Sequence, residues 1–540
     1  MTGPVQPPPA SSQAAGHNEP APPPLSDDTT PRVLAGPPTI TLTATETQIC
    51  ALLQEVVERI HQQAPATPRL VLRIAGGWVR DKLLGLSSHD IDIAIDHMSG
   101  FELAQHVTQY LAESGATARS VAKIASNPER SKHLETATTV VLGQMVDFVN
   151  LRSETYNAES RVPLVEYGTP LEDAMRRDIT INALFYNIGE RRVEDWTQRG
   201  LEDLRRGLVR TPMEPRQTFE DDPLRVLRVV RFASRFGYAV DGPTAEALGL
   251  ADVRRALGAK ISRERVGAEV ALMAAGPRPL VAIRLLIAHG LYPAVFRAPD
   301  TLPAAADVLP ADVAQRLTHE VLALLDTPRL AGCLPLADLA GGVDEARRVL
   351  ALAAYLYPFH AARVADGRRQ TPVAAALVVM RDALKMSNHD MDTVVALHAL
   401  APAVAATAAD IGRDPAAVSR AHLGLEIRRA ARLWPLAVVF AAAVDMLPVE
   451  GVSGAPMAEA VVEKYVGYVG CVGERGLERA FEIKHLVDGR RAADILGVRP
   501  GPVIRQVLDR VLVWQLDHPE GTREQCEAFV RDAGLPFVPA

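Results

Sequence analysis

The pattern of apolar and polar positions divides the chain into a mixed part and a helical part. Helical spacing runs over residues 48–62, and residues 69–75 then alternate in the manner typical of a strand. Two further strands are predicted over residues 89–96 and 144–151. After about Pro215 the strand signals fade into an Ala-, Leu- and Arg-rich helical pattern broken by Pro and Gly. The pattern therefore predicts an α+β fold, with a mixed sheet and helices first and an all-α remainder.

The first 40 residues differ from everything that follows. They are rich in Pro, Ala, Ser and Gly and hold too little apolar surface to offset the entropy of folding, so residues 1–40 are predicted to be a disordered extension. Arg32 is the only Lys or Arg there, which is a poor match to an Arg-rich mitochondrial presequence. A hydrophobic signal core is also missing, and we expect a protein that is not secreted.

Composition bears on RNA binding, on the state of the cysteines and on membrane insertion. The formal net charge of −7 is not that of a typical nucleic-acid binder, so any RNA contact must use local patches. The four cysteines are far apart and form no CxxC pair, which favours reduced thiols inside a cell. We find no apolar run long enough to span a membrane; the longest, residues 434–444, suits a buried helix.

Two acidic residues on a predicted strand are the first candidate for chemistry. Successive strand side chains point to opposite faces, so Asp90 and Asp92 share a face while the intervening isoleucines enter the core. Two carboxylates at this spacing can share hard divalent cations such as Mg²⁺. Upstream, Gly76 and Gly77 allow backbone amides to approach a phosphate, and Arg80 lies one helical turn later.

Three further motifs follow the first. Asp147 lies on another predicted strand and is a candidate third carboxylate, or else a surface strand residue. Paired arginines before a predicted amphipathic helix, with Arg177 the second, suit phosphate binding. Carboxylates at residues 194–203 are as well explained as helix caps. A charged helix face then carries a residue every three positions: Asp222, Arg225, Arg228 and Arg231.

Taken in order, these motifs resemble the class II tRNA nucleotidyltransferases, or CCA-adding enzymes, of the polymerase β-like superfamily. The Gly-Gly-x-Val-Arg-Asp motif, the Asp-x-Asp pair, Arg-Arg-Asp and Glu-Asp-Asp-Pro-Leu-Arg carry the resemblance. Residues 146–156 and 261–267 are similar to the eukaryotic branch in particular. The likeness is strong over residues 74–267 and weaker beyond.

The resemblance implies a role for each motif and a division into domains. Asp90 and Asp92 would hold two metal ions, Mg²⁺ by default, with Asp147 as a third acidic group. The nucleotide would be bound by Gly76, Gly77, Arg80, Arg177, Asp222, Arg225, Arg228 and Arg231. A head (residues 41–212) would precede a neck (213–275) and an all-α body and tail (276–540) that bind tRNA.

The chemistry of the bases explains how one protein site can accept both CTP and ATP. Cytosine and adenine each present an amine donor beside a ring-nitrogen acceptor, whereas guanine and uracil present the reverse. A carboxylate acceptor at Asp222 beside a guanidinium donor at Arg225 therefore pairs with C or A. Unpaired polar groups penalise G and U.

Other activities stay open at this stage. A C-adding or A-adding enzyme or a poly(A) polymerase would share the core motifs, and the rival from another class is a non-catalytic tRNA-binding protein. Basic pairs at residues 254–255, 428–429 and 490–491 are candidate tRNA contacts or plain solvated faces. We expect an intracellular protein of the cytoplasm, the nucleus or both, and of mitochondria as well.

Overall fold

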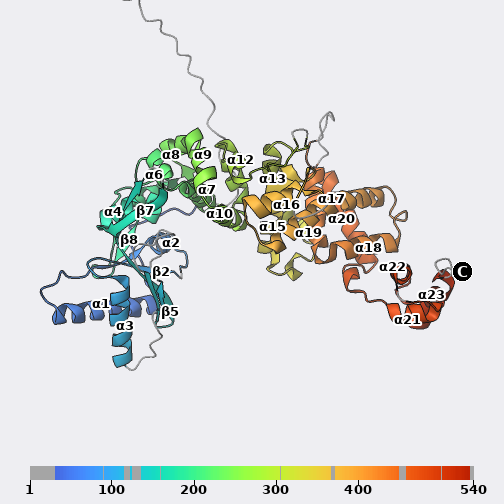
Figure 1. Ribbon diagram of the computed structural model, residues 1–540, viewed down its shortest axis with the longest axis horizontal. Coiled ribbons are helices and arrows are strands. Elements are labelled where there is room, and N and C mark those ends of the chain that lie inside the picture. Colours follow the sequence, from blue (N-terminus) through green and yellow to red (C-terminus); the bar gives the residue numbers. More distant parts are fainter. Residues whose placement is uncertain are drawn as a thin grey trace, which may run out of the picture.

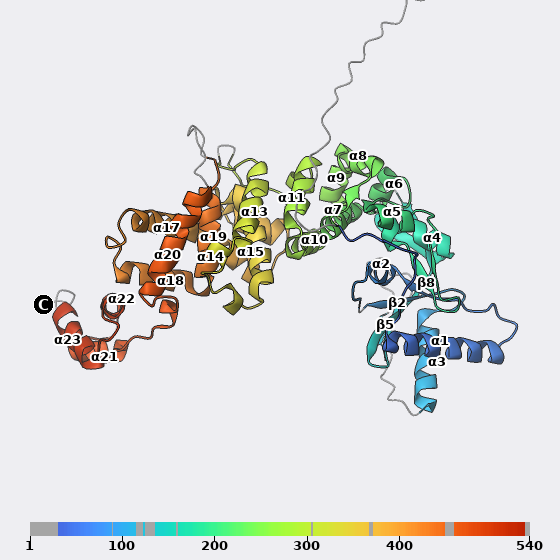
Figure 2. The same cartoon turned by 180° about the vertical axis from the view of Figure 1, so that it is seen from behind.

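The computed structural model has the shape of an open arch with a sheet-containing head at one end (Figure 1). Helices form the rest of the arch, and a small helical module ends it on the side opposite the head (Figure 2). The structure describes residues 31–88, 90–114, 122–124, 136–157, 160–303, 306–366, 371–448, 458–499 and 501–534.

The head is built on a mixed seven-stranded sheet of order β3-β4-β5-β2-β1-β8-β9. Only the central pair β2 and β5 is parallel among the neighbours described, and the other pairs are antiparallel. The strands are β1 (Leu72–Ala75), β2 (Ile91–Ile95), β3 (Ala122–Ile124), β4 (Thr136–Val141), β5 (Gln144–Asn150), β8 (Phe185–Asn187) and β9 (Arg192–Glu194). The mixed sheet predicted from the sequence is confirmed.

Local sequence explains these elements. Ile91, Ile93 and Ile95 are buried on β2, as the alternation predicts. Capping boxes start three helices of the head, with Thr43 and Glu46 at α1 (Ala44–Gln63), Ser99 and Glu102 at α3 (Gly100–Glu113), and Thr169 and Glu172 at α4 (Pro170–Met175). The other head elements are α2 (Gly77–Leu83), the hairpin β6 (Arg152–Asn157) and β7 (Ser160–Tyr167), a 3₁₀ turn (Thr180–Asn182) and α5 (Gly200–Arg206).

The predicted helical part begins directly after the head. Its first section holds β10 (Leu208–Val209), α6 (Pro215–Asp221), α7 (Leu224–Phe236), β11 (Ala239–Val240), α8 (Gly242–Leu248), α9 (Ala251–Lys260) and α10 (Arg263–Ala275). The strands β10 and β11 form a short parallel pair. Helix α7 reaches back toward the head, because its amphipathic face buries Val226, Val229 and Val230 in the common core.

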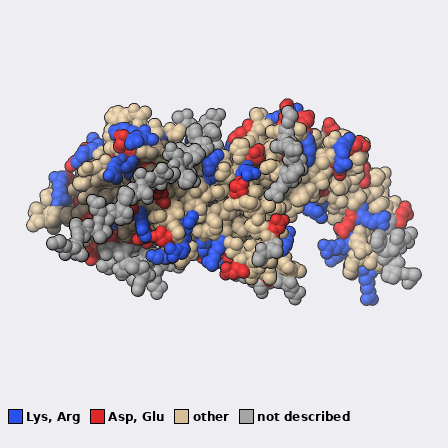
Figure 3. Space-filling view, turned by 90° about the horizontal axis from the view of Figure 1, so that it is seen from above, with Lys and Arg blue, Asp and Glu red and all other residues tan. Residues whose placement is uncertain are grey.

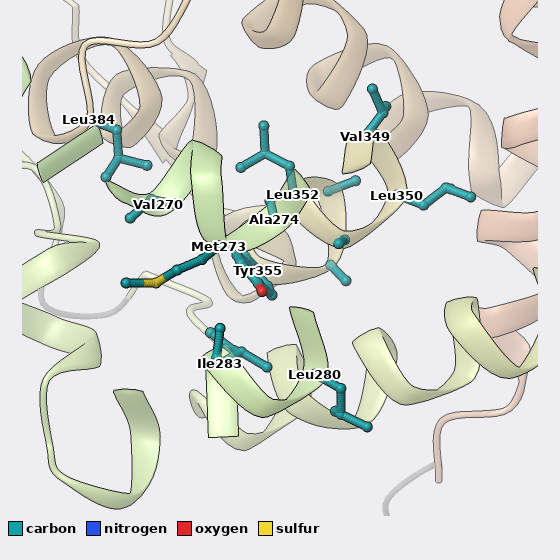
Figure 4. Packing of buried hydrophobic residues seen from close by; sticks show 14 of the residues in the cluster. Val270, Met273, Ala274, Leu280, Ile283, Val349, Leu350, Leu352, Tyr355 and Leu384 are labelled. Atoms are coloured by element: carbon teal, nitrogen blue, oxygen red, sulfur yellow. The ribbon is translucent and has the colours of Figure 1, made fainter. Parts of the chain in front are cut away.

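The middle of the arch is a bundle of helices around an aliphatic core. It contains α11 (Pro279–Ala288), α12 (Tyr292–Val295), α13 (Asp312–Leu325), α14 (Pro328–Ala331), α15 (Gly342–Leu356), α16 (Ala375–Val378), α17 (Asn388–Arg413), α18 (Arg420–Ala430), α19 (Trp434–Asp445) and α20 (Ala458–Glu474). A two-stranded ribbon, β12 (Arg363–Val364) and β13 (Val373–Ala374), and a π-helical turn (Val379–Ala383) interrupt it. Side chains from α10, α11 and α15 interlock at its start (Figure 4).

Helix α10 joins this bundle through unusually close contacts. The Arg263 guanidinium donates to the carbonyls of Ala383, Ala294 and Val295, with distances of 2.6, 3.2 and 2.5 Å. A Cβ atom placed on Gly267 would lie 1.7 Å from the Leu384 carbonyl oxygen, so only glycine allows this approach. The two contacts fix the direction in which the bundle leaves the head.

The last module has a core of its own. Helices α21 (Gly489–Leu496), α22 (Pro502–Asp517) and α23 (Arg523–Gly534) enclose a cluster that includes Val511, Cys526 and Val530. Figure 3 shows basic and acidic side chains interspersed over the visible face of the whole molecule, in keeping with the modest net charge. The described cysteines are unpaired thiols, as predicted.

Two expectations from the sequence are corrected. Helix α17 is long and apolar enough to cross a membrane, with a mean hydropathy of 1.7 in its most apolar window, although no such run was expected. Half of that window is buried, and the helix packs against α15, α19 and α20, which explains its composition. The predicted apolar run at residues 434–444 is the buried helix α19.

The N-terminal extension is the second correction. Residues 1–30 lie outside the described part, but residues 31–40 are ordered against the molecule. Leu34 is buried and its amide donates to the Leu204 carbonyl at 3.2 Å, while the Tyr238 hydroxyl donates to the Arg32 carbonyl. A single leucine in a Pro-rich stretch gave too weak a periodic signal to predict this docking.

Candidate active site

A cleft of about 610 Å³ lies where the head sheet meets helix α7. It is lined by the ends of β1, β2 and β5, the start of α2, the segment after α4, and α7 with Arg265 of α10. Four aspartates line it, namely Asp92, Asp173, Asp178 and Asp222. Nine arginines line it as well: Arg80, Arg152, Arg176, Arg177, Arg225, Arg228, Arg231, Arg235 and Arg265. This excess of cations suits a polyanionic ligand.

The parallel pairing of β2 and β5 brings two predicted carboxylates side by side. Asp92 is the register partner of Asp147, whose carboxylate accepts a hydrogen bond from the Thr138 hydroxyl at 2.5 Å. Burial raises the pKa of Asp92, and the Asp147 carboxylate raises it further, while Arg177 opposes both. Two like charges held this close repel each other, and a cation between them would relieve the repulsion.

Asp90, the other member of the predicted Asp-x-Asp pair, lies just outside the strand, and its charge also raises the pKa of Asp92. Asp90 is exposed just before β2, and neither Asp90 nor Asp147 is among the described residues that line the cleft. In the described parts of the chain, no three Asp, Glu, His or Cys side chains are grouped closely enough to hold a metal ion. The residues best placed to share a divalent cation are therefore Asp92 and Asp147, whose oxygen atoms are the donor type that hard cations prefer.

The glycine turn lies at one wall of the cleft. Gly76 has a φ of 72°, which favours glycine, and the Arg177 guanidinium lies next to it, 2.7 Å from where a Cβ atom would be. Gly77 begins α2, and Arg80 one turn later is buried between the Phe232 and Phe236 rings. Arg80 also donates to Asp81 at 2.8 Å. Burial lowers the pKa of Arg80.

The paired arginines are fixed by one buried carboxylate. Asp173 accepts from Arg176 at 2.6 Å through one oxygen and from Arg177 at 2.8 Å through the other. Burial alone would raise the pKa of Asp173, but the two guanidiniums lower it to about 2. The expectation of an amphipathic helix after the arginines is wrong. They follow α4, and the chain continues into a 3₁₀ turn (Thr180–Asn182) because the segment is buried against the sheet.

The charged face of α7 opens onto the same cleft. Arg225 is buried and donates to the Arg176 carbonyl. Arg228 donates to Asp178 at 2.7 Å and Arg231 donates to Glu269 at 2.6 Å. The three-residue spacing predicted from the sequence therefore does place these arginines along one wall.

Asp222 lies at the junction of α6 and α7. One of its carboxylate oxygens accepts from the Leu224 amide at 3.2 Å, and the other accepts from Arg265 at 3.0 Å. Asp222 and Arg225 both line the cleft, so a carboxylate and a guanidinium face the same space. This is the donor and acceptor pair that the sequence predicts.

Three charged residues were missed as site residues at the sequence level. Asp173 and Arg152 line the cleft and Glu269 pairs with Arg231, but in the sequence all three look like ordinary surface charges beside or within the recognised motifs. Their common signal is proximity in the chain to Arg177, Asp147 and Arg265, which only the fold turns into proximity in space.

Other charged features of the sequence have structural roles. Asp195 accepts from the Leu201 amide at 2.9 Å, as expected of a cap near α5, and Glu194 pairs with the buried Arg73 at 2.7 Å. Arg428 donates to the Ile483 carbonyl at 2.7 Å, and Arg491 pairs with Glu527 at 2.7 Å. Arg428 and Arg491 thus make contacts within the fold.

Comparison with known proteins gives consistent results for the head and for the whole chain. The Poly A polymerase head domain family matches residues 72–210. The CCA tRNA nucleotidyltransferase, mitochondrial, of Candida glabrata is 35% identical over 524 residues, which cover 93% of this chain and 97% of that protein. The protein of the same name from Saccharomyces cerevisiae is 36% identical, over 90% and 93% of the two chains.

A solved structure shares the fold over the same length. The Thermotoga maritima CCA-adding enzyme complexed with tRNA superposes with a TM-score of 0.58, at 17% sequence identity. The superposition covers 91% of this chain and 96% of that one. The helical arch is therefore shared along with the head.

Proposed function

The chain belongs to the family of CCA tRNA nucleotidyltransferases, and from this premise we propose that Asp90, Asp92 and Asp147 form the metal-dependent centre with which it adds C, C and A to tRNA 3′ ends. The substrates are CTP, ATP and the tRNA acceptor end, and pyrophosphate is released. The observation that supports this assignment most directly is the cleft in which Asp92, the strand neighbour of Asp147, faces nine arginines.

The reaction is an in-line attack of the tRNA 3′ hydroxyl oxygen on the α-phosphorus of the nucleotide. The bond from the α-phosphorus to the bridging oxygen breaks, and the electron pair leaves with pyrophosphate. Arg80 and Arg177 bind the triphosphate beside the Gly76–Gly77 turn, and Arg228 and Arg231 support it from α7. Holding the two reactants in line removes much of the entropic cost of the step.

Divalent ions held by these carboxylates, Mg²⁺ by our proposal, would lower the pKa of the attacking hydroxyl and neutralise charge on the leaving pyrophosphate. Burial and, after it, the neighbouring Asp147 carboxylate raise the pKa of Asp92, and a cation held between the two carboxylates would offset both effects, which supports such a site.

Base selection falls to Asp222 and Arg225. The Asp222 carboxylate accepts a hydrogen bond from the exocyclic amine of cytosine or adenine, and the Arg225 guanidinium donates to the adjacent ring nitrogen. Arg265 supports this role because its hydrogen bond holds one Asp222 oxygen in place. With uracil or guanine, the Asp222 carboxylate would face a carbonyl oxygen, and the Arg225 guanidinium would face a ring N–H group.

The remaining proposals concern domains and compartment. We assign residues 41–212 to a catalytic head, 213–275 to a neck that carries the base-recognition helix, and 276–540 to a tRNA-binding body and tail. The two yeast relatives are named as mitochondrial, which supports mitochondria as one place of action beside the cytoplasm or nucleus.

The test is incorporation of labelled CTP and ATP into tRNA that lacks its tail. Wild type should add two C and one A, and Asp92→Ala should add nothing. Asp300→Ala, in which a highly exposed aspartate is removed, should behave as wild type. A product with only C, only A or a long A tract would replace this activity with a narrower one of the same superfamily. Binding of tRNA without any addition would favour the non-catalytic rival.

A further inference from the structure

Arg152 differs from every other arginine of the cleft. The other eight each have a carboxylate partner, from 2.6 Å for Arg176 with Asp173 to 3.9 Å for Arg225 with Glu154. The Arg152 guanidinium makes no hydrogen bond and no ion pair within the described structure. A partly buried cation without a partner is costly in a folded protein, which calls for an explanation.

The backbone at this position is held tightly. The Arg152 amide donates to Asp173 at 3.3 Å, and a Cβ atom on Gly168 would lie 2.5 Å from the Arg152 carbonyl carbon. Arg152 begins β6 and is separated by one residue from the end of β5, the strand that carries Asp147, and its side chain lines the cleft together with Asp92. The unpaired guanidinium is therefore not the result of a loose loop.

Charges of both signs surround Arg152. Burial lowers its pKa most, the Arg176 guanidinium lowers it further, and the Asp173 and Glu154 carboxylates act in the opposite direction. Those two carboxylates are engaged by other arginines, because Asp173 accepts from Arg176 and Arg177 and Glu154 accepts from Arg176. Among the described residues, Arg152 is therefore the member of this guanidinium cluster without a hydrogen bond or an ion pair of its own.

We propose that Arg152 binds the β- and γ-phosphates of the incoming CTP or ATP. This inference rests on the proposed function and adds a substrate-binding residue to it. A triphosphate is favoured over the RNA backbone, because three adjacent guanidiniums match several negative charges on one group, whereas a phosphodiester carries one. The Arg177 guanidinium lies against the Gly76 turn, so the cluster and the turn face the same ligand.

The experiment measures binding of CTP and of cytidine monophosphate to the full chain without tRNA, by calorimetry. Arg152→Gln should weaken CTP binding about tenfold to a hundredfold, the range expected for loss of hydrogen bonds to a charged group. It should change cytidine monophosphate binding less than twofold. Arg152→Lys should recover part of the loss, since it keeps the charge but not the planar fork. The control Arg192→Gln removes an exposed arginine of the head and should change neither affinity.

Two further measurements, the melting temperature and the KM for tRNA, complete the test. Arg152→Gln should melt no lower than wild type, because it removes a partly buried cation that makes no hydrogen bond or ion pair among the described residues, and its KM for tRNA should stay within twofold. Equal losses for CTP and cytidine monophosphate, a change confined to the KM for tRNA, or no change at all would each overturn the proposal. Failure of wild type to bind any nucleotide would instead overturn the proposed function, so the two failures are distinct.

Discussion

The cleft and the helical bundle are held together by different kinds of interaction. The cleft is held by arginine–carboxylate pairs around Asp173, Asp178 and Glu269, several of them buried. The bundle is held by aliphatic side chains, and its buried Tyr355 satisfies its hydroxyl on a backbone carbonyl at 2.6 Å. Buried ion pairs add little net stability but fix geometry, whereas apolar packing supplies stability with little chemical consequence. We therefore expect activity and stability to respond separately to substitutions in the two regions.

The largest effect should come from Asp92→Asn. Loss of a carboxylate at the metal centre should reduce the rate of CTP addition by about a thousandfold or more, roughly 4 kcal/mol in the activation free energy. Because burial and Asp147 raise the pKa of Asp92, its ionised form costs stability near neutral pH, and the amide should not lower the melting temperature. Single-turnover kinetics and calorimetry on one preparation measure both. A melting temperature well below that of wild type would contradict the separation.

The second effect tests the cleft as a structural unit. Asp173→Asn leaves Arg176 and Arg177 without their shared charge and should destabilise the fold by about 3 kcal/mol at pH 7. Since the folded pKa of Asp173 is lowered to about 2, its stabilising effect is full above its ordinary value near 4 and is lost as pH falls through 4 toward 2. Urea unfolding at several pH values should show the gap to wild type closing over that range.

A control for this series is Asp326→Asn, which removes an exposed surface carboxylate of the bundle. Its effect should stay below about 1 kcal/mol at every pH. A gap between Asp173→Asn and wild type that does not change with pH would mean that Asp173 acts through its shape and not its charge.

The third effect concerns the joint between α10 and the bundle. Gly267→Ala puts a methyl group against the Leu384 carbonyl and should cost about 2 kcal/mol of stability. The matched variant Gly258→Ala, in α9 with open space around it, should stabilise the protein by about 0.5 kcal/mol. Denaturant midpoints measure both, and the preference for CTP over UTP should be unchanged in each. A changed preference for CTP over UTP in Gly267→Ala would contradict this prediction and show that the contact between α10 and the bundle affects the cleft.

The smallest effect should come from the terminal module. Val530→Ala opens a cavity in a core that is separate from the rest, and should cost about 1 kcal/mol of local stability. Hydrogen exchange should quicken in α21–α23 alone, with CTP affinity unchanged. Loss of protection throughout the bundle would show that the two cores unfold together.

How far the sequence could anticipate this molecule depends on the range of the interactions. The alternation at Ile91, Ile93 and Ile95 is local, so β2 and the position of Asp92 could be predicted. The spacing of Arg225, Arg228 and Arg231 is likewise local to one helix, whereas Asp222, expected on the same helix face, lies before the helix at the end of α6. The parallel register of β2 with β5, which makes Asp92 a neighbour of Asp147, follows from a crossover that no single segment specifies.

The misses have the same origin. The docking of Leu34 on Leu204 and the hold of Asp173 on Arg176 and Arg177 depend on tertiary context. Asp90 stays a predicted site residue, and it lies exposed directly before the start of β2 at Ile91. Family-like motifs located the cleft, while the contacts that orient its side chains came only from the fold.

One side chain, Arg263, joins two distant segments of the arch. Its guanidinium donates hydrogen bonds to carbonyls at the ends of α12 and of the π-helical turn, which are about 90 residues apart in the chain. A change at this position would leave both ends uncapped at once, so two helices would fray from a single replacement. In a random mutational scan, position 263 should therefore tolerate fewer residues than its partly exposed place at the start of α10 suggests.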